Sequence, residues 1–272
     1  MTYLFSSNVE VSNDQGNPLP ISANTSVNSS TNPIYVSTAG GSNQGKLWYF
    51  QVAQGTVAGT IPVFKAGFNS AIANNTEESL WPGSVIYPWS AWDTTGTLSC
   101  VSTDGDTGTL EIIGLRAADF VQITETVTLT NTTPVITANS FARINSLHYN
   151  STTPNAGAIN VSRGGTVVGK IDIGFGVSQM AQYTVPAGYT AYILTGSSNI
   201  GKGNDGIGRF KYRLHGGSMQ TAMVFLLFQS TFNYEFQAPL VLPEKTDLDA
   251  TLEATNAGTA ATCAYSLILI AN

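Results

Sequence analysis

The sequence predicts an all-β protein: an antiparallel β-sandwich, jelly-roll-like, with an extended N-terminal arm. Three observations indicate this class. Short runs of alternating or β-rich residues recur from residue 97 to the end, and Gly-, Pro- and Asn-rich turns separate them. Helical periodicity is weak, and its two candidates, 69–79 and 115–120, are short. A chain of 272 residues has room for one large β domain or two smaller ones.

Residues 1–45 are the first predicted segment, an extended arm that anchors the protein. Within it, NDQGNPLPISANTSVNSSTNP (13–33) is too polar to build a core of its own. Two pieces, NVEV (8–11) and PIYVS (33–37), have β-rich content, and such pieces can add to the edge of a neighbour's sheet. The alternative is a frayed terminus.

Residues 46–98 are predicted as a β-rich lead-in packed on the main domain. KLWYFQVAQG (46–55) and GTIPVFKAGFN (59–69) have the composition of strands, and the irregular stretch ESLWPGSVIYPWSAW (78–92) follows. Its prolines oppose regular structure. Its tryptophans either bind sugars or partner proteins or pin a long loop onto the sheet. They are Trp81, Trp89 and Trp92.

The main β-sandwich is predicted over 99–272. Strands are expected near 97–103, 108–115, 120–130, 134–149, 157–161, 166–173, 178–185, 189–197, 207–214, 219–229, 232–237, 247–255 and 260–270.

Two motifs in this region make sharper predictions. YTVPAGYTAYIL (183–194) predicts a hairpin closed by the turn 186–188. In TETVTLT (124–130) the four threonines share one face of a strand, while Val127 and Leu129 share the other. We therefore expect that strand to be apolar inside and hydroxylated outside.

The charge and cysteine content restrict the function. Only 10% of the residues are charged, against roughly 25% in a typical soluble domain. The net charge of −6 gives no basic field for nucleic acid. No leader peptide and no membrane insertion are expected, because the apolar runs are short. Cys100 and Cys263 are expected to be buried thiols, although a disulfide between them is possible.

No catalytic or metal-binding motif emerges, so no cofactor is expected. His148 and His215 are not at ligand spacing. The glycines of GKGNDGIG (201–208) precede a strand pattern, whereas a dinucleotide fingerprint opens a helix. Asp104 and Asp106 could hold calcium, or they stabilise a turn.

One strand carries a basic stripe and another an acidic stripe. In RFKYRL (209–214) every second residue is basic: Arg209, Lys211 and Arg213. This stripe could grip a phosphate, an acidic glycan or an acidic neighbour. In TDLDATLEAT (246–255) the acids share one face: Asp247, Asp249 and Glu253. The two stripes either pair, between or within subunits, or face solvent.

Several blocks of the chain resemble virion structural proteins of tailed bacteriophages of marine bacteria and cyanobacteria. The similar blocks span roughly 46–272: ESLWPGSVIYPWSAW (78–92), LEIIGL (110–115), ITETVTLTNTTPVITANSFARINSL (123–147), YTVPAGYTAYI (183–193), PLVLPEKTDLD (239–249) and SLILI (266–270). WPGS at 81–84 departs from the family's usual WSGG. The resemblance implies a part of a phage particle and supplies no catalytic residue.

Together these observations predict a non-enzymatic structural protein of the virion, made in the cytoplasm of the bacterial host. We expect a head-decoration or fibre-like subunit, attached through its arm. Its partners would be capsid, neck or tail proteins and copies of itself in a homotrimer. The alternative is a tail-fibre or adaptor protein that binds a host-surface glycan, and a polysaccharide-cutting enzyme is a third reading. The candidate interaction surface comprises Trp81, Trp89, Trp92, Arg209, Lys211 and Arg213.

Overall fold

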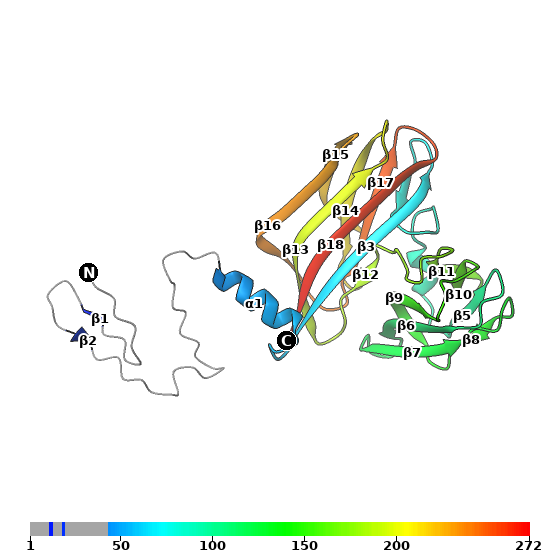
Figure 1. The fold of residues 1–272 in the computed structure, drawn as a ribbon, viewed down its shortest axis with the longest axis horizontal. Helices are drawn as coiled ribbons and strands as arrows, with labels where there is room; N and C mark the ends of the chain where they lie inside the picture. The colour runs from blue at the N-terminus through cyan, green and yellow to red at the C-terminus, as the bar shows by residue number, and fades with distance from the viewer. Residues whose placement is uncertain (1–10, 13–17, 20–42) are drawn as a thin grey trace. The chain divides into compact units, whose positions relative to one another are not determined.

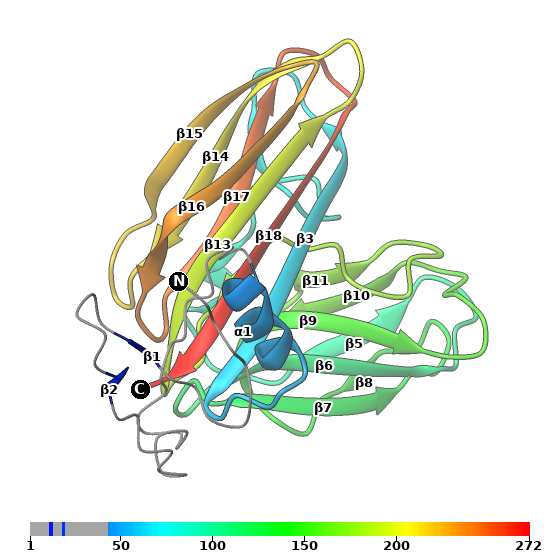
Figure 2. The ribbon, with the colours of Figure 1, turned by 60° about the vertical axis from the view of Figure 1, so that its left-hand side comes forward.

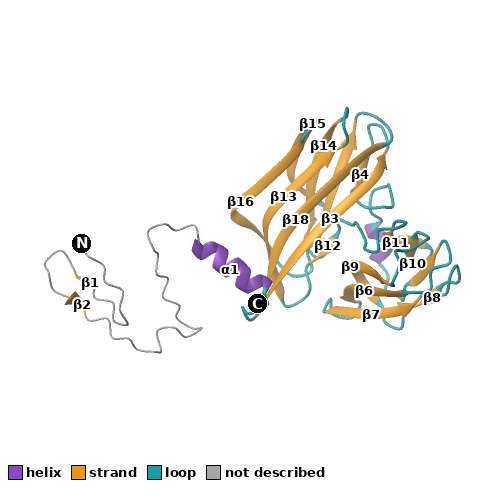
Figure 3. Ribbon diagram, in the orientation of Figure 1, coloured by secondary structure: helices purple, strands orange, loops and turns teal. Residues whose placement is uncertain are grey.

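The computed structural model describes residues 11–12, 18–19 and 43–272, and within them the protein is all-β with antiparallel sheets (Figure 1). This confirms the predicted class. The chain divides into two units, Met1–Gln51 and Val52–Asn272. Among the described residues the helical elements are α1 (Asn43–Ala53) and the single turn η2 (Trp89–Trp92), as Figure 3 shows.

In the first unit, β1 (Val11–Ser12) pairs antiparallel with β2 (Pro18–Leu19). The predicted strand piece 33–37 and most of the predicted arm lie outside the described residues. Helix α1 overturns the expectation of a strand at 46–55. Its apolar residues are contiguous and do not alternate as on a half-buried strand. Gly55, at φ +69°, donates its N–H to the Val52 carbonyl and ends the helix.

The strands of the second unit are β3 (Thr60–Ile72), β4 (Glu77–Ser79), β5 (Ser99–Ser102), β6 (Thr109–Arg116), β7 (Gln122–Thr128), β8 (Val135–Ile136), β9 (Phe141–Asn150), β10 (Ile159–Arg163), β11 (Thr166–Ile171), β12 (Tyr183–Thr184), β13 (Tyr189–Ile200), β14 (Asp205–Arg213), β15 (Gln220–Phe228), β16 (Thr231–Leu242), β17 (Asp247–Ala254) and β18 (Thr259–Ala271). They form two halves with separate cores. The framing half contains β3, β4 and β12–β18, and the inserted half contains β5–β11.

Two sheets make the framing half (Figure 2). Their side chains share one hydrophobic core. One sheet has the order β16-β13-β18-β3; the other has the order β12-β17-β14-β15, with β4 beside β17. Ile193 and Leu267 from the first sheet meet Leu248 and Leu252 from the second. Full burial of each such side chain contributes roughly 1.5–3 kcal/mol. Strands β3 and β18 are the first and the last strands of the unit in the sequence, and they pair along most of their length.

The inserted half is built from sheets β11-β10-β5-β8 and β7-β6-β9, drawn in green in Figure 1. Leu110, Phe141 and Ile159 are fully buried in its core. The chain leaves the framing half after β4 and returns to it at β12. Each half therefore consists of a pair of sheets, and both halves belong to one unit. The chain passes from one half to the other in the Trp-rich loop and returns in residues 172–182.

Strand β7 confirms the predicted threonine face. Its threonines are exposed, whereas Val127 and the following Leu129 are buried at 7% and 1% exposure. Among the described strands, β7 pairs with β6 alone. Hydroxyls therefore cover one outer edge of the inserted half.

The two weak helix candidates do not form helices, and one local prediction, a hairpin, is wrong. The helix candidates 69–79 and 115–120 are the ends of β3 and β6, the strand β4 and a turn. The expected hairpin over 183–194 does not form, because β12 pairs with β17 while β13 pairs with β16 and β18. The turn at Gly188, with φ +82°, instead carries the chain from one sheet to the other. Turn-forming residues indicate that the chain reverses its direction, but they do not indicate which strands pair.

Candidate functional site

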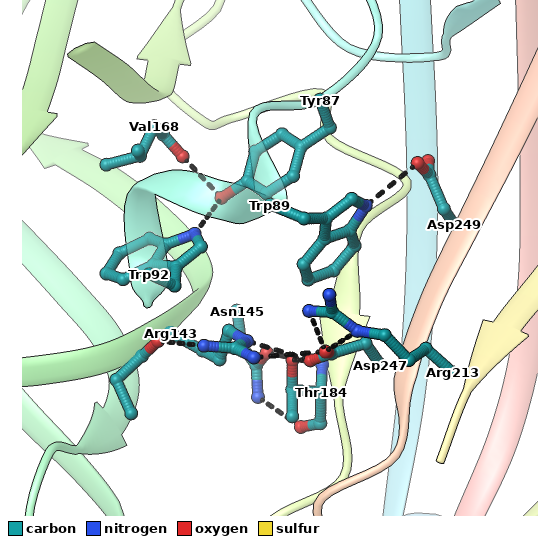
Figure 4. A network of polar contacts seen from close by, with 11 residues as sticks. Tyr87, Trp89, Trp92, Arg143, Asn145, Val168, Thr184, Arg213, Asp247 and Asp249 are labelled. Carbon is teal, nitrogen blue, oxygen red and sulfur yellow. Dashed lines mark hydrogen bonds and ion pairs between the residues drawn. The ribbon is translucent and has the colours of Figure 1, made fainter. Parts of the chain in front are cut away.

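The Trp-rich loop between β4 and β5 is fastened to the inserted half by its own side chains. Trp81, Tyr87 and Trp92 are buried at 2%, 2% and 6% exposure. The Trp92 Nε1 donates to the Tyr87 hydroxyl at 3.1 Å, and that hydroxyl donates to the Val168 carbonyl at 2.8 Å (Figure 4). For Trp81 and Trp92 the loop-pinning alternative therefore holds, and neither forms an exposed interaction surface.

The Trp89 ring lies beside two arginines that come from different halves (Figure 4). The guanidinium of Arg143 on β9 lies 5.8 Å from the Trp89 ring centroid, and that of Arg213 on β14 lies 5.2 Å from it. Its Nε1 donates to Asp249 at 3.2 Å. Arginine over an indole face is a favourable cation–π contact. Trp89 thus contacts both cations and is only partly exposed.

Asp247 on β17 forms ion pairs with both of these arginines. Arg143 donates to it from Nε and Nη2 at 2.8 and 3.1 Å, and Arg213 donates from Nη2 at 2.6 Å. The Thr184 hydroxyl donates at 2.6 Å. Because Asp247 is 2% exposed, these bonds are made away from water. We call the set Trp89, Arg143, Arg213, Asp247 and Asp249 the junction.

Asp249 is the second carboxylate of the junction, two residues along the same strand face. It accepts hydrogen bonds from the Ser79 hydroxyl at 2.8 Å, the Gln182 amide at 2.6 Å and Trp89. Burial raises its pKa to about 6 in spite of these donors. Protein groups surround both carboxylates, so the arrangement couples the two halves and leaves little room at its centre for a substrate.

The basic and acidic stripes pair within the chain, because β14 lies beside β17. Arg209 contacts Glu253 at 3.0 Å and Glu77 at 3.8 Å, and Lys211 forms an ion pair with Glu77. Burial raises the pKa of Glu77, but the Lys211 and Thr251 hydrogen bonds and the two cationic charges outweigh it, so the pKa is lowered. The side chains of the basic stripe therefore already have carboxylate partners within the chain, and an external phosphate would compete with these carboxylates.

Sequence reasoning missed the partners Glu77 and Arg143. Both residues lie far before the stripes in the sequence. The pairing of β4 with β17 brings Glu77 to the stripes, and the contact between the two halves brings Arg143 there. Alternation within one strand identifies a charged face, but it carries no signal for a partner on a distant strand.

The Asp104–Asp106 turn has the hydrogen bonds of a structural turn. Asp104 accepts from the Gly105 N–H at 2.7 Å. Asp106 accepts from the Ser102 hydroxyl and from two backbone N–H groups at 2.6–2.9 Å. Over the described residues, no group of three or more His, Cys, Asp or Glu side chains is arranged to hold a metal ion.

The two histidines lie apart. The Nε2 of His148 on β9 contacts the Ser146 hydroxyl at 2.8 Å. His215 packs edge-on against Phe120, with ring centroids 5.1 Å apart, in the turn after β14.

A cleft lies where β3 approaches β9 and β6. Phe64, 73% exposed, stands on β3, and the rest of the lining mixes apolar side chains such as Ile61 and Ile113 with polar ones. Lys65 Nζ donates to the Asn145 carbonyl at 2.5 Å, and burial lowers its pKa to about 8. The polar lining residues are Gln122, Asn145, Ser146, His148, Ser178 and Gln179.

Strand β15 forms an apolar outer edge of the framing half. Val224, Leu226 and Phe228 point outward and are 57%, 57% and 65% exposed. Their alternate neighbours Phe225 and Leu227 belong to the framing core. A row of three large, exposed apolar side chains on one strand is unusual for a protein that works alone in water.

In the part of the chain that the structure describes, no helix has both the length and the apolar character needed to cross a membrane. No protein-family model matches the chain, and neither does any curated protein.

Proposed function

We propose that this protein is a non-enzymatic structural subunit of a tailed-phage virion, a head-decoration or fibre-like part attached through residues 1–45. In this proposal the framing half is a β-sandwich of jelly-roll type, and the inserted half projects from it. The order of the blocks that resemble phage structural proteins supports the assignment to a virion.

The observation that carries an assembly role is the apolar outer row of β15. Edge strands of soluble proteins are normally guarded by charge, proline or cover. Val224, Leu226 and Phe228 have none of these on their exposed side. A low charge content of 10% adds to this, because surfaces that neighbours cover need fewer charges.

The junction supports a mechanical role for the unit. Its ion pair between β9 and β17 and the Trp89 contacts tie the inserted half to the framing half. Buried charges that are hydrogen-bonded in one geometry favour one fixed arrangement. A virion part benefits from such rigidity, since its neighbours are placed by its shape.

The test compares phage particles assembled with the full chain and with a chain lacking residues 1–45. We expect cryo-EM density for the full chain on the capsid or tail, and none for the truncated chain. Circular dichroism must show that the truncated chain keeps its β structure. Incorporation of the truncated chain, or particles that lack the full chain altogether, would contradict the proposal.

A second candidate is a tail-fibre or adaptor protein that binds a host-surface glycan, and the cleft beside Phe64 favours it. Sugar sites combine an exposed ring with amide and hydroxyl donors, and pockets often lie where two packed units meet. In this candidate the sugar-stacking ring is Phe64 and not Trp89, because Trp89 already contacts Arg143 and Arg213 and is only partly exposed. The cleft supplies Gln122 and Gln179 as polar partners.

Calorimetry with host-surface polysaccharide tests this second candidate. We expect binding by the wild type, loss of binding in Phe64→Ala, and unchanged binding in Val241→Ala, which is an exposed apolar position on β16. Absence of binding at micromolar concentrations excludes the candidate. A reducing-sugar assay on the same mixtures tests whether the polysaccharide is cut.

A further inference from the structure

We propose that the free edge of β15 is an interface between two copies of this chain, in which the two β15 strands pair antiparallel and join their sheets into one. This inference rests on the proposed function, because it names the first neighbour of an assembly subunit. It requires no contact with other virion proteins.

The backbone of β15 offers an open edge. Nine residues, Gln220–Phe228, pair with β14 on one side, and no described strand lies on the other side. The strand is therefore about 30 Å long. Such an edge presents a row of N–H and C=O groups that a second strand can satisfy.

The side chains of β15 lack the features that guard the other long edges of the described sheets. Strand β3 carries Pro62 and Lys65, and β16 carries Glu235 and Pro239. Edge strand β7 carries Glu125. By contrast, 216–234 contains neither a charged residue nor a proline. Natural edge strands without such guards are normally covered.

A second copy fits this edge better than an unrelated partner because the strand is complementary to itself. In a two-fold antiparallel pair each apolar row meets the same row of the other strand. A charged strand would oppose like charges in this arrangement, whereas β15 is neutral throughout. Val224, Leu226 and Phe228 would then contact the same row of the other copy side by side on the joined sheet.

Aromatic rings beside the edge extend the contact. Phe225 of β15 stacks on Phe232 of β16, with ring centroids 4.5 Å apart and planes at 5°. Tyr234 continues this column at 6.2 Å and is 44% exposed. The column lines an apolar pocket together with residues of β13, β14 and β18. The exposed ring of Tyr234 therefore adds apolar surface close to β15.

The test measures the mass of the purified full chain by light scattering at up to roughly 100 µM. We expect a dimer for the wild type. Leu226→Lys adds a charge to the apolar row of each copy and should weaken the dimer by about tenfold or more. Val241→Lys is the matched control, since Val241 is 53% exposed on the edge strand of the other sheet; it should remain a dimer. Near-ultraviolet circular dichroism checks that each variant is folded.

Amide hydrogen exchange of the wild type provides a second readout that needs no variant. Pairing predicts that outward N–H groups of β15 are protected at high concentration and lose protection on dilution. Three results would overturn the inference: a monomer at every concentration, a trimer indifferent to Leu226→Lys, or rapid exchange of these groups in the concentrated sample. None of them would contradict the virion role, because incorporation into particles is measured separately.

Discussion

Arg143 of β9 and Asp247 of β17 lie in different halves of the molecule and form a two-point ion pair. The Nε–Oδ1 and Nη2–Oδ2 distances are 2.8 and 3.1 Å, and the side chains are 11% and 3% exposed. Removing one partner of such a pair leaves the other charge buried and only partly compensated, which costs more than the pair itself contributes.

Replacing Arg143 with Leu should therefore lower the free energy of unfolding by roughly 2–4 kcal/mol, because Asp247 keeps only Arg213 and Thr184. Urea unfolding at neutral pH measures the change. The matched control is Arg116→Leu, whose partner Asp119 is 41% exposed and whose own side chain is 48% exposed. This change breaks a solvent-exposed ion pair and should lower the free energy of unfolding far less than Arg143→Leu does. Equal effects of the two variants would contradict a buried junction.

Asp249 predicts a specific dependence of stability on pH. Burial raises its pKa to about 6, so the folded protein holds this proton at a pH where the unfolded chain has lost it. The stabilisation is fully present below about pH 4 and is lost as the pH rises through about 6. Asp249→Asn has no such titration. Between pH 4 and 7 the variant should gain roughly 2–3 kcal/mol relative to the wild type in urea unfolding.

Asp106 supplies a control of opposite sign for this experiment. Burial raises its pKa, but the Ser102 hydroxyl and the Ala156 and Gly157 N–H groups outweigh it, so the pKa is lowered. Its contribution is present above about pH 4 and is lost as the pH falls. The difference between wild type and Asp106→Asn should therefore shrink on acidification. A flat difference for Asp249→Asn over the same range would show that its carboxyl titrates normally.

The sequence predicts much of the fold because strand signals are local. The alternation in 124–130 correctly places the threonines outside and Val127 inside. Strand pairing is not local, so the hairpin expected at 183–194 fails although both of its strands exist. The run LWYF (47–50) fails for a different reason: contiguous apolar residues satisfy a helix or a strand equally well.

The candidate sites are predictable only in part, for a related reason. Arg209, Lys211 and Arg213 stand out in the sequence, yet Glu77 and Arg143, which complete their network, carry no local signal. The tryptophans stand out equally, but burial depends on which loop folds over which sheet. The apolar edge of β15 is invisible in sequence, since TAMVFLLF (221–228) is also what a central strand would contain.

Gly67 on β3 marks a close approach of backbones that no side chain tolerates. A Cβ at this position would lie 2.4 Å from the Leu80 carbonyl oxygen and 2.9 Å from the Ala181 nitrogen. Backbone atoms cannot rotate away, so Gly67→Ala should cost about 1–3 kcal/mol or more. Gly196 on β13 has open space around the same position. Gly196→Ala should be neutral or slightly stabilising, and thermal unfolding of both variants checks the contrast.

The two cysteines report on the two halves separately. Cys100 lies in the core of the inserted half and Cys263 in that of the framing half, and both are free thiols. Burial raises the pKa of each to about 12. Because the thiolate is the reactive form, neither should react with an Ellman-type reagent at pH 8 in the folded protein.

In increasing urea, both thiols should become reactive over the same transition, because the junction couples the halves. Mass spectrometry of labelled peptides distinguishes Cys100 from Cys263. In Arg143→Leu the coupling is weakened, so labelling of the two cysteines should separate into two transitions. Separate transitions already in the wild type would show that the halves unfold independently and that the Arg143–Asp247 pair does not couple them. Rapid labelling without urea would instead contradict the burial of the thiols.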